Sequence, residues 1–568
     1  MSAPPSARPE RWALAGVLTL LPLLLSWPLP ARFTSHVMAA PDQEAAPHIW
    51  GLWAAGQTAQ PLRIETFLQA FPDGVGLVLV DPLNLPAYHL GALLGPAAGY
   101  NLVLITGIVL MGIAGALLAR ELGGRPWLGA TAAMACPTLL ANAADGMTEG
   151  FGVGMVGVFL ALLLRARRSE SRWTTVLAGL ALGATTWAGP YNAIWAGLLG
   201  LGVAAWTTWR RRWDHLRTTA MVGAIGVLVG LPVGVAIFRS RDEGLPGGSD
   251  RAGLPEIIEN PHIFRGGVRT GADLLDPLLP IQLTGSEADV SHTAYLGLVL
   301  VAAACVAAVR HPRARPFLAA AAAFALLSLG PWLYLGGSVL RLGDAPLAGP
   351  AGLAILAVPV LGRLTRWYRA GAVATLLLAP LAARLPRSTP VAIGLGLAIL
   401  IDTLALAPLA WPLHASALPP TRPIAQLPHP GALLELPPVT SGEPPPGAWR
   451  DLSALAQVQH GRPIGGSMMG LGVSPAAREG TDAIRALTRT GQLDGVLHER
   501  IRSDGFRYLV IHLAHHPVPR AGGEHLTACL GPPVVHTATL RVHDLGVPGT
   551  PAGCSTDVMT VPSAGSGL

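Results

Sequence analysis

The sequence contains no lysine, and charged residues of any kind are scarce. Asp, Glu, Lys and Arg together make up 13% of the 568 residues, whereas soluble globular proteins have about 25%. Hydrophobic residues make up 51%, and the mean hydropathy is +0.47. This balance excludes a soluble enzyme. Long apolar runs approach the roughly 20 residues that cross a bilayer, so the sequence predicts an α-helical polytopic membrane protein.

All 39 basic residues are arginine, and this has two explanations. A GC-rich genome codes arginine in place of lysine; alternatively, arginine is used for its bidentate contacts with phosphate. The net charge of +6 would suit a nucleic-acid partner. However, the arginines lie in short loops between apolar runs, where basic residues set the orientation in the membrane. We therefore expect no nucleic-acid partner.

The four cysteines do not have the spacing of a metal site or of a disulfide framework. Cys136 and Cys305 lie within apolar runs and are expected to be packing residues. Cys529 and Cys554 lie in the polar C-terminal region and could pair if that region is outside the cytoplasm. The sequence assigns no metal ligand and leaves the cofactor unknown, with a divalent metal as an open alternative.

The apolar runs predict about 11 transmembrane helices, with the N-terminus inside and the C-terminus outside. Arginine-rich loops alternate along the chain with loops that have few basic residues, as the positive-inside rule requires. The apolar run 351–362 is too short to cross and predicts an interfacial or re-entrant piece. The predicted spans are 12–30, 100–118, 127–144, 148–164, 174–188, 191–206, 218–238, 293–309, 317–336, about 371–384, and 391–409.

The composition predicts two domains. Residues 1–410 form the transmembrane domain, with large external loops at 31–99 and 239–292. A proline-rich linker follows at 411–430. Residues 431–568 are expected to form a small soluble extracytoplasmic α/β domain, with strands near 433–436 and 508–512 and a helix near 476–488.

Two acids follow the first predicted helix at the level of the outer headgroups. Asp42 and Glu44 precede His48 and two tryptophans, and aromatic residues are enriched at the membrane interface. A carboxylate there can accept a proton from an acceptor hydroxyl while a lipid-borne donor lies in the interface. The alternative is an ordinary solvated loop acid.

Three arginines lie outside in this topology, against the positive-inside rule: Arg363, Arg366 and Arg369. Arg366 and Arg369 are three residues apart and would share one helical face. They could bind the phosphate of a lipid-linked sugar and stabilise negative charge on the leaving group. The alternatives are contact with ordinary lipid headgroups and a cytoplasmic position of this segment.

Two external turns supply further candidates for the same site. Glu149 lies four residues after Asp145 and would share its face if that helix continues, with helix capping as the alternative. Tyr191 and Asn192 lie in a Gly-Pro-Tyr-Asn turn. Asp402 lies deep in the last apolar run, where a carboxylate is costly and is expected to face protein or water.

The order of several short motifs resembles the GT-C superfamily of integral membrane glycosyltransferases, and specifically its poorly characterised bacterial branch. The similar stretches span most of the chain and are 42–53, Phe71-Pro72-Asp73-Gly74, Gly99-Tyr100-Asn101-Leu102, Asp145-Gly146-Met147-Thr148-Glu149, Tyr295-Leu296-Gly297, Leu329-Gly330-Pro331, Arg366-Trp367-Tyr368-Arg369 and Gln459-His460-Gly461-Arg462-Pro463.

The resemblance implies transfer of a sugar from a polyprenyl-phosphate carrier to an extracytoplasmic glycan, lipid or protein, at a bacterial cytoplasmic membrane. Asp42 would then be the catalytic base or the acid that orients the acceptor. Glu44 is the alternative, because the first external segment lacks the adjacent pair of acids found in better-known branches. Membrane lipids are expected partners. Two other readings stay open: a lipid or glycan transporter or flippase, which would have inverted repeats, and a non-catalytic envelope-assembly protein.

Overall fold

A computed structural model describes residues 7–39, 45–58, 60, 62–169, 171–242, 271–280, 293–358, 361, 364, 366–407, 411–419, 421–437, 447–466, 474–490, 501–514 and 516–546. The chain divides into two compact units, each built from separate segments. Unit 1 comprises Met1–Ala40, Ala55–Arg63 and Val78–Ala417, and unit 2 comprises Pro41–Ala54, Ile64–Leu77 and Leu418–Leu568.

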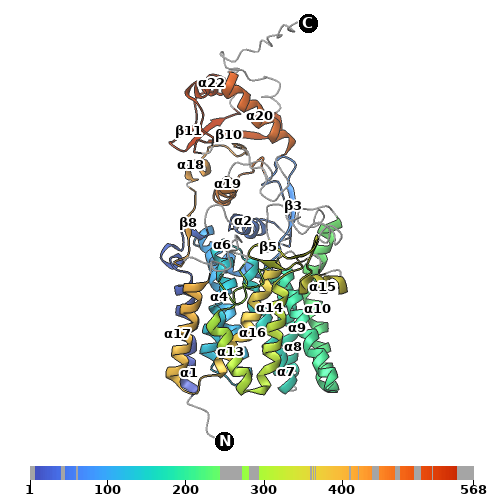
Figure 1. Ribbon diagram of the computed structural model, residues 1–568. Coiled ribbons are helices and arrows are strands. Elements are labelled where there is room, and N and C mark those ends of the chain that lie inside the picture. Colours follow the sequence, from blue (N-terminus) through green and yellow to red (C-terminus); the bar gives the residue numbers. More distant parts are fainter. Residues whose placement is uncertain are drawn as a thin grey trace. The chain divides into compact units, whose positions relative to one another are not determined.

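Unit 1 is a helical body in which the apolar runs form helices that lie side by side (Figure 1). Four of the described helical stretches are long and apolar enough to cross a membrane: Pro96–Glu121, Glu149–Ser169, Trp213–Arg239 and Thr389–Leu406. The main helices are α1 (Ala7–Leu25), α4 (Pro96–Glu121), α5 (Pro126–Met134), α6 (Pro137–Asp145), α7 (Val153–Ser169), α8 (Arg172–Trp187), α9 (Pro190–Trp209), α10 (Trp213–Asp242), α13 (Leu298–Arg310), α14 (Arg315–Ser328), α16 (Ala370–Arg384) and α17 (Thr389–Leu406).

A helix begins or runs within each predicted span, but two of the predicted spans are wrong in their extent. The run 127–144 forms two helices, α5 and α6, because Pro137 lacks the amide hydrogen that would continue α5. The run 317–336 is helical only as far as Ser328. Its apolar end instead enters two short hairpins, one formed by β4 (Tyr334–Leu335) and β5 (Ser338–Val339) and the other by β6 (Arg341–Leu342) and β7 (Ala345–Pro346).

Helix α16 lies inside the helical body. Fourteen of its side chains, Ala370 to Ala383, are buried, and the helix packs against α4, α5, α7, α13 and α14 (Figure 1). Small residues make this possible: five of the first ten are alanine or glycine, which lets neighbouring backbones approach closely. The residues just before α16 are therefore held at a fixed position at the end of the body.

Short elements connect the helices of unit 1. Strand β1 pairs antiparallel with β8, which lies within the segment predicted as a linker. The predicted interfacial run begins as the eight-residue helix α15. The short elements are η1 (Leu29–Arg32), β1 (His36–Met38), η2 (Pro82–Asn84), α3 (Leu85–Ala92), η3 (Glu149–Gly152), η5 (Pro312–Ala314), β4 (Tyr334–Leu335), β5 (Ser338–Val339), β6 (Arg341–Leu342), β7 (Ala345–Pro346), α15 (Pro350–Ala357), η7 (Trp367–Arg369) and β8 (Ala415–Ala417).

Unit 2 contains a four-stranded sheet in the order β11-β12-β10-β9. Strands β9 and β10 are parallel, and the other neighbouring pairs are antiparallel. The two predicted strands and the predicted helix are confirmed as β9, β10 and α20. The elements are α2 (Ala45–Ala55), β2 (Arg63–Thr66), β3 (Val75–Val78), α18 (Arg422–Ala425), β9 (Ala432–Leu436), α19 (Gly447–His460), α20 (Pro475–Thr490), β10 (Phe506–His512), α22 (Arg520–Leu530), β11 (Val535–His536) and β12 (Leu540–Asp544).

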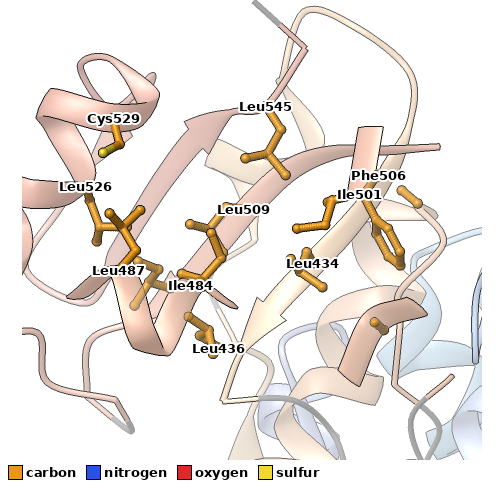
Figure 2. Packing of buried hydrophobic residues seen from close by; sticks show 13 residues of the cluster. Leu434, Leu436, Ile484, Leu487, Ile501, Phe506, Leu509, Leu526, Cys529 and Leu545 are labelled. Carbon is orange, nitrogen blue, oxygen red and sulfur yellow. The ribbon is translucent and has the colours of Figure 1, made fainter. Parts of the chain in front are cut away.

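Alternating side chains of β9 and β10 face two separate apolar cores of unit 2. Leu434, Leu436 and Leu509 pack under α20 and α22, as Figure 2 shows. Leu433 and Val510 pack on the opposite face. Strand positions two residues apart share a face, so strand β9, in which all five residues are buried, packs on both sides.

Candidate functional site

Arg366 and Arg369 lie at the N-terminal end of α16. Arg366 has a non-helical backbone with φ −123° and ψ 68°, and Trp367–Arg369 form the single turn η7 that leads into the helix. The expectation of one shared helical face is therefore wrong, because the chain enters the helix only after both residues. The Arg369 side chain is nonetheless fixed, since it is only 5% exposed at the end of a buried helix.

The two guanidinium groups converge on the sulfur atom of Met147. The Arg366 Nη1 atom lies 2.8 Å from this sulfur, and the Arg369 Nη2 atom lies 3.3 Å from it. A thioether is only a weak hydrogen-bond acceptor. Arg369 also donates to the Glu149 carboxylate at 2.5 Å, but its Nε atom has no hydrogen-bond partner among the described residues. Arg369 therefore has fewer strong hydrogen-bond acceptors around it than its five N–H donors could use.

The start of α9 joins this cluster. The Tyr191 hydroxyl accepts the backbone N–H of Arg366 at 3.0 Å, and the tyrosine ring lies 4.9 Å from the Arg369 guanidinium carbon in a cation–π contact. Asn192 donates to the carbonyl oxygens of Ala188 and Glu149 at 2.9 and 3.4 Å. The structure thus brings together five of the predicted site residues: Arg366, Arg369, Glu149, Tyr191 and Asn192.

A turn between α6 and η3 positions Met147 and Glu149. Gly146 adopts a left-handed conformation with φ 83° and ends α6, so Asp145 and Glu149 do not share a helical face. The Tyr100 hydroxyl donates to the Gly146 carbonyl. These contacts fix the turn that carries the two partners of Arg369.

Asp81 is a buried acid at this turn that the sequence did not distinguish from a loop residue. Its carboxylate is 1% exposed. It accepts the Thr148 hydroxyl and, at 2.8 Å, the side-chain N–H of Asn84. An aspartate before a proline is typical of the start of a turn, and no signal in the sequence pointed to its burial beside Glu149.

The remaining predicted residues fall in other places. Asp42 and Glu44, and also Arg363, lie outside the described residues. His48 lies half-buried on α2 of unit 2. In the described part of the chain no group of three His, Cys, Asp or Glu side chains could hold a metal ion.

Asp402, whose partner the sequence could not identify, caps another helix. Its carboxylate accepts the Tyr295 hydroxyl at 2.7 Å and the backbone N–H of Val299 at 2.9 Å. Val299 lies in the first turn of α13, where backbone N–H groups have no partner within the helix. Asp402 of α17 therefore acts as an N-terminal cap supplied by a different helix.

Comparison with known proteins gives a likeness of fold. The chain is similar to the structure of the arabinofuranosyltransferase AftD from Mycobacteria, with a TM-score of 0.53 and 18% identity. The aligned region covers 96% of this chain but only 40% of AftD. A structure of ArnT from Cupriavidus metallidurans bound to undecaprenyl phosphate aligns with a TM-score of 0.39 and 13% identity, over 95% of this chain and 98% of ArnT.

No protein-family model matches the sequence, and no curated protein sequence matches it. The likeness to AftD shows that the chain shares the fold of that arabinofuranosyltransferase, in agreement with the kind of fold that the sequence motifs imply. Since the chain spans about 40% of the length of AftD, the comparison extends to the fold alone.

Proposed function

We propose that this protein is a membrane glycosyltransferase that moves a sugar from a polyprenyl-phosphate carrier to an extracytoplasmic acceptor: a glycan, a lipid or a protein. The observation that carries the proposal is the convergence of Arg366 and Arg369 on the neutral Met147 sulfur. Two cations directed at one point, with Glu149 as the carboxylate that pairs with Arg369, favour an anionic ligand. Arginine binds phosphate oxygens in bidentate geometry.

In the reaction we infer, an acceptor hydroxyl attacks the anomeric carbon of the lipid-linked sugar and inverts it. The bond between that carbon and the phosphate oxygen breaks, and the polyprenyl phosphate leaves with the electron pair. Arg366 and Arg369 would stabilise the developing negative charge. Asp42, or Glu44 in its place, would accept the proton of the hydroxyl. Tyr191 would hold the Arg366 backbone through its 3.0 Å hydrogen bond.

The proposed topology has about 11 spans and places the small α/β domain outside the cytoplasm. Two facts support it. Arginine-rich loops alternate with loops of few basic residues along unit 1. Cys529 of α22 is disulfide-bonded, whereas Cys136 and Cys305 are free; Cys554 lies outside the described residues. Disulfides persist in oxidising compartments such as the bacterial periplasm.

Binding of undecaprenyl phosphate to the full-length protein tests the phosphate site. We expect Arg369→Ala to weaken this binding at least about tenfold, which corresponds to 1.4 kcal/mol, and Arg369→Lys to weaken it less. Polyprenol without the phosphate should bind equally to all variants. Arg310→Ala, an exposed arginine at the end of α13, is the matched control. Native mass spectrometry from detergent micelles measures each complex.

Equal binding of undecaprenyl phosphate to Arg369→Ala and to the unmodified protein would contradict the phosphate site. Transfer is tested separately with a panel of radiolabelled polyprenyl-phosphate sugars and membrane extract, comparing Asp42→Asn and Glu44→Gln. Unchanged transfer in both variants would remove these acids from the mechanism. A transporter would be favoured if the protein bound the lipid phosphate and moved the lipid-linked sugar across the membrane of proteoliposomes, but transferred no sugar to an acceptor.

A further inference from the structure

A surface of unit 1 exposes large apolar side chains from segments that the helical spans do not include. Between β4 and the end of α15 the exposed ones are Leu335, Leu342, Leu347, Leu353, Leu356 and Val358. Exposed fractions reach 76% at Leu342 and 62% at Leu356. Single exposed leucines are ordinary in soluble proteins, but several in one segment indicate an interaction surface. The exposed charged residues among them are Arg341 and Asp344 of the β6–β7 hairpin.

A second segment adds to this surface. Leu274, Leu275 and Leu278 are also exposed. Their segment is joined to the hairpin: Leu274 donates its backbone N–H to the Tyr334 carbonyl at 2.9 Å. The buried Asp273 carboxylate accepts the Gly337 N–H at 3.1 Å. We name residues 273–278 and 335–358 together the apolar apron.

Helix α15 exposes two of its three large apolar side chains. Its buried positions are occupied by Ala351 and Ile355, whereas Leu353 and Leu356 point away from the protein. In water the leucines would be the buried residues. Burying alanine and exposing leucine is favourable only where the surroundings are themselves apolar.

Close backbone contacts hold helix α15 in this orientation. A Cβ atom on Gly352 would lie 2.6 Å from the Pro331 carbonyl oxygen, and one on Gly349 would lie 2.4 Å from the Gly330 oxygen. Such approaches are open only to glycine. The contacts hold the small-residue face of α15 against the loop that follows α14.

The apron is continuous with a helix that belongs to the membrane body. Helix α14 packs against α15 and also against η7, which carries Arg369. It exposes Leu326, one turn before its end. The apolar surface therefore continues from a helix of the body onto the apron, at the same end of the body as Arg366 and Arg369.

From this continuity we propose that the apolar apron lies within the bilayer surface and contacts the acyl chains of the leaflet at which Arg366 and Arg369 lie. A helix with an apolar face lies in the interface with that face in the headgroup and acyl boundary. The apron would thereby hold the two arginines at the depth of lipid phosphate groups. This last consequence rests on the proposed function; the membrane contact does not.

Spin-label accessibility in the full-length protein, reconstituted in phosphatidylcholine nanodiscs, tests the proposal. Nitroxides are attached to Leu353→Cys and Leu356→Cys in a Cys305→Ser background, and collision rates with oxygen and with a water-soluble nickel complex are compared. Leu228→Cys on α10, exposed within an apolar span, is the lipid control; His536→Cys on unit 2 is the water control. The parent without an added cysteine supplies the background signal.

We expect labels at 353 and 356 to collide severalfold more with oxygen than with nickel, as at 228 and opposite to 536. Preferential collision with nickel would show a surface in water, and collision with neither would show a surface covered by protein; both results overturn the proposal. Because the measurement needs no donor, its outcome is independent of undecaprenyl-phosphate binding by the Arg369 variants.

Discussion

At the scale of single residues, carboxylates within the apolar body have specific partners. Asp402 illustrates the reason: an ionised group away from water must be compensated by hydrogen bonds. Its two oxygens receive the Tyr295 hydroxyl and the Val299 amide. Asp402, a carboxylate that the sequence places at an energetically costly position within an apolar run, therefore connects α17 to the start of α13.

We predict that Asp402→Ala destabilises the protein by about 1–3 kcal/mol, because it leaves a buried amide hydrogen without an acceptor. Asp402→Asn retains an acceptor oxygen and should cost less. Thermal unfolding in detergent measures both variants. Ile401→Ala, at a neighbouring exposed position of the same helix, is the control. Equal melting temperatures for Asp402→Ala and Ile401→Ala would contradict the capping role.

The residues of the candidate site were predictable to different degrees. Arg366 and Arg369 stood out because the predicted topology places their charge outside, against the positive-inside rule. Met147 did not, because a thioether is only a weak hydrogen-bond acceptor and is not an expected partner of arginine. Asp81 did not, because its contact with Thr148 joins segments 67 residues apart, and a single sequence does not reveal such pairings.

At the scale of helices, glycine sets how closely α4 and α5 approach. A Cβ atom on Gly115 would lie 2.3 Å from the Gly129 carbonyl oxygen, and one on Gly129 would lie 2.6 Å from the Gly115 oxygen. Helices in membranes gain stability from such close packing. The crossing therefore depends on the absence of side chains at both positions.

Gly115→Ala should destabilise the protein by about 1–3 kcal/mol, since the added methyl group forces the two helices apart. Gly197→Ala on α9 is the matched control: a Cβ atom there meets nothing within 4 Å, and alanine favours a helix by up to about 1 kcal/mol over glycine. Unfolding midpoints in detergent should fall for the first variant and stay or rise for the second. An unfolding midpoint that is lower for Gly197→Ala than for Gly115→Ala would contradict the role of glycine in the packing of α4 against α5.

Helix positions were predictable because hydropathy along the chain reports burial in lipid or protein directly. The residues at which the helices end were less predictable. The apolar residues after Ser328 extend the hydrophobic run, yet the chain there forms hairpins whose leucines are exposed. An apolar run does not distinguish a spanning helix from an apolar surface of another shape, and for this reason the span 317–336 was predicted too long.

At the scale of the whole molecule, the stability of unit 2 depends on histidines whose pKa values are shifted by burial. Unit 2 buries neutral histidines. His543 accepts the Arg541 Nε–H at 2.9 Å and lies 3.0 Å from the Gly531 carbonyl oxygen. Burial, helped by the Arg541 charge, lowers the pKa of His543 to about 4. Burial likewise lowers the pKa of His460 to about 4.

These shifts predict that unit 2 loses stability in acid. An unfolded histidine has a pKa of about 6.5, so between about pH 6.5 and 4 the unfolded state binds more protons than the folded state, and stability falls as the pH falls. Hydrogen exchange of β10 and β12 in the full-length protein, corrected for the intrinsic rate, should increase across this window.

The slope of this pH dependence should be smaller in His543→Gln, which removes one of these two histidines, and unchanged in His429→Gln, at an exposed position before β9. Exchange that is independent of pH between 6.5 and 4 in the unmodified protein would contradict the prediction.

The interleaving of the two units has a consequence for synthesis. Trp50 of α2 donates to Gln457 of α19 at 2.7 Å, across 407 residues of sequence. At roughly 5–20 residues per second, the ribosome makes Trp50 about 20–80 s before its partner. Throughout that interval the helices of unit 1 are emerging while the early segments of unit 2 lack the sheet on which they pack. The nascent chain must therefore keep the incomplete apolar surface of unit 2 from making non-native contacts until translation is nearly finished.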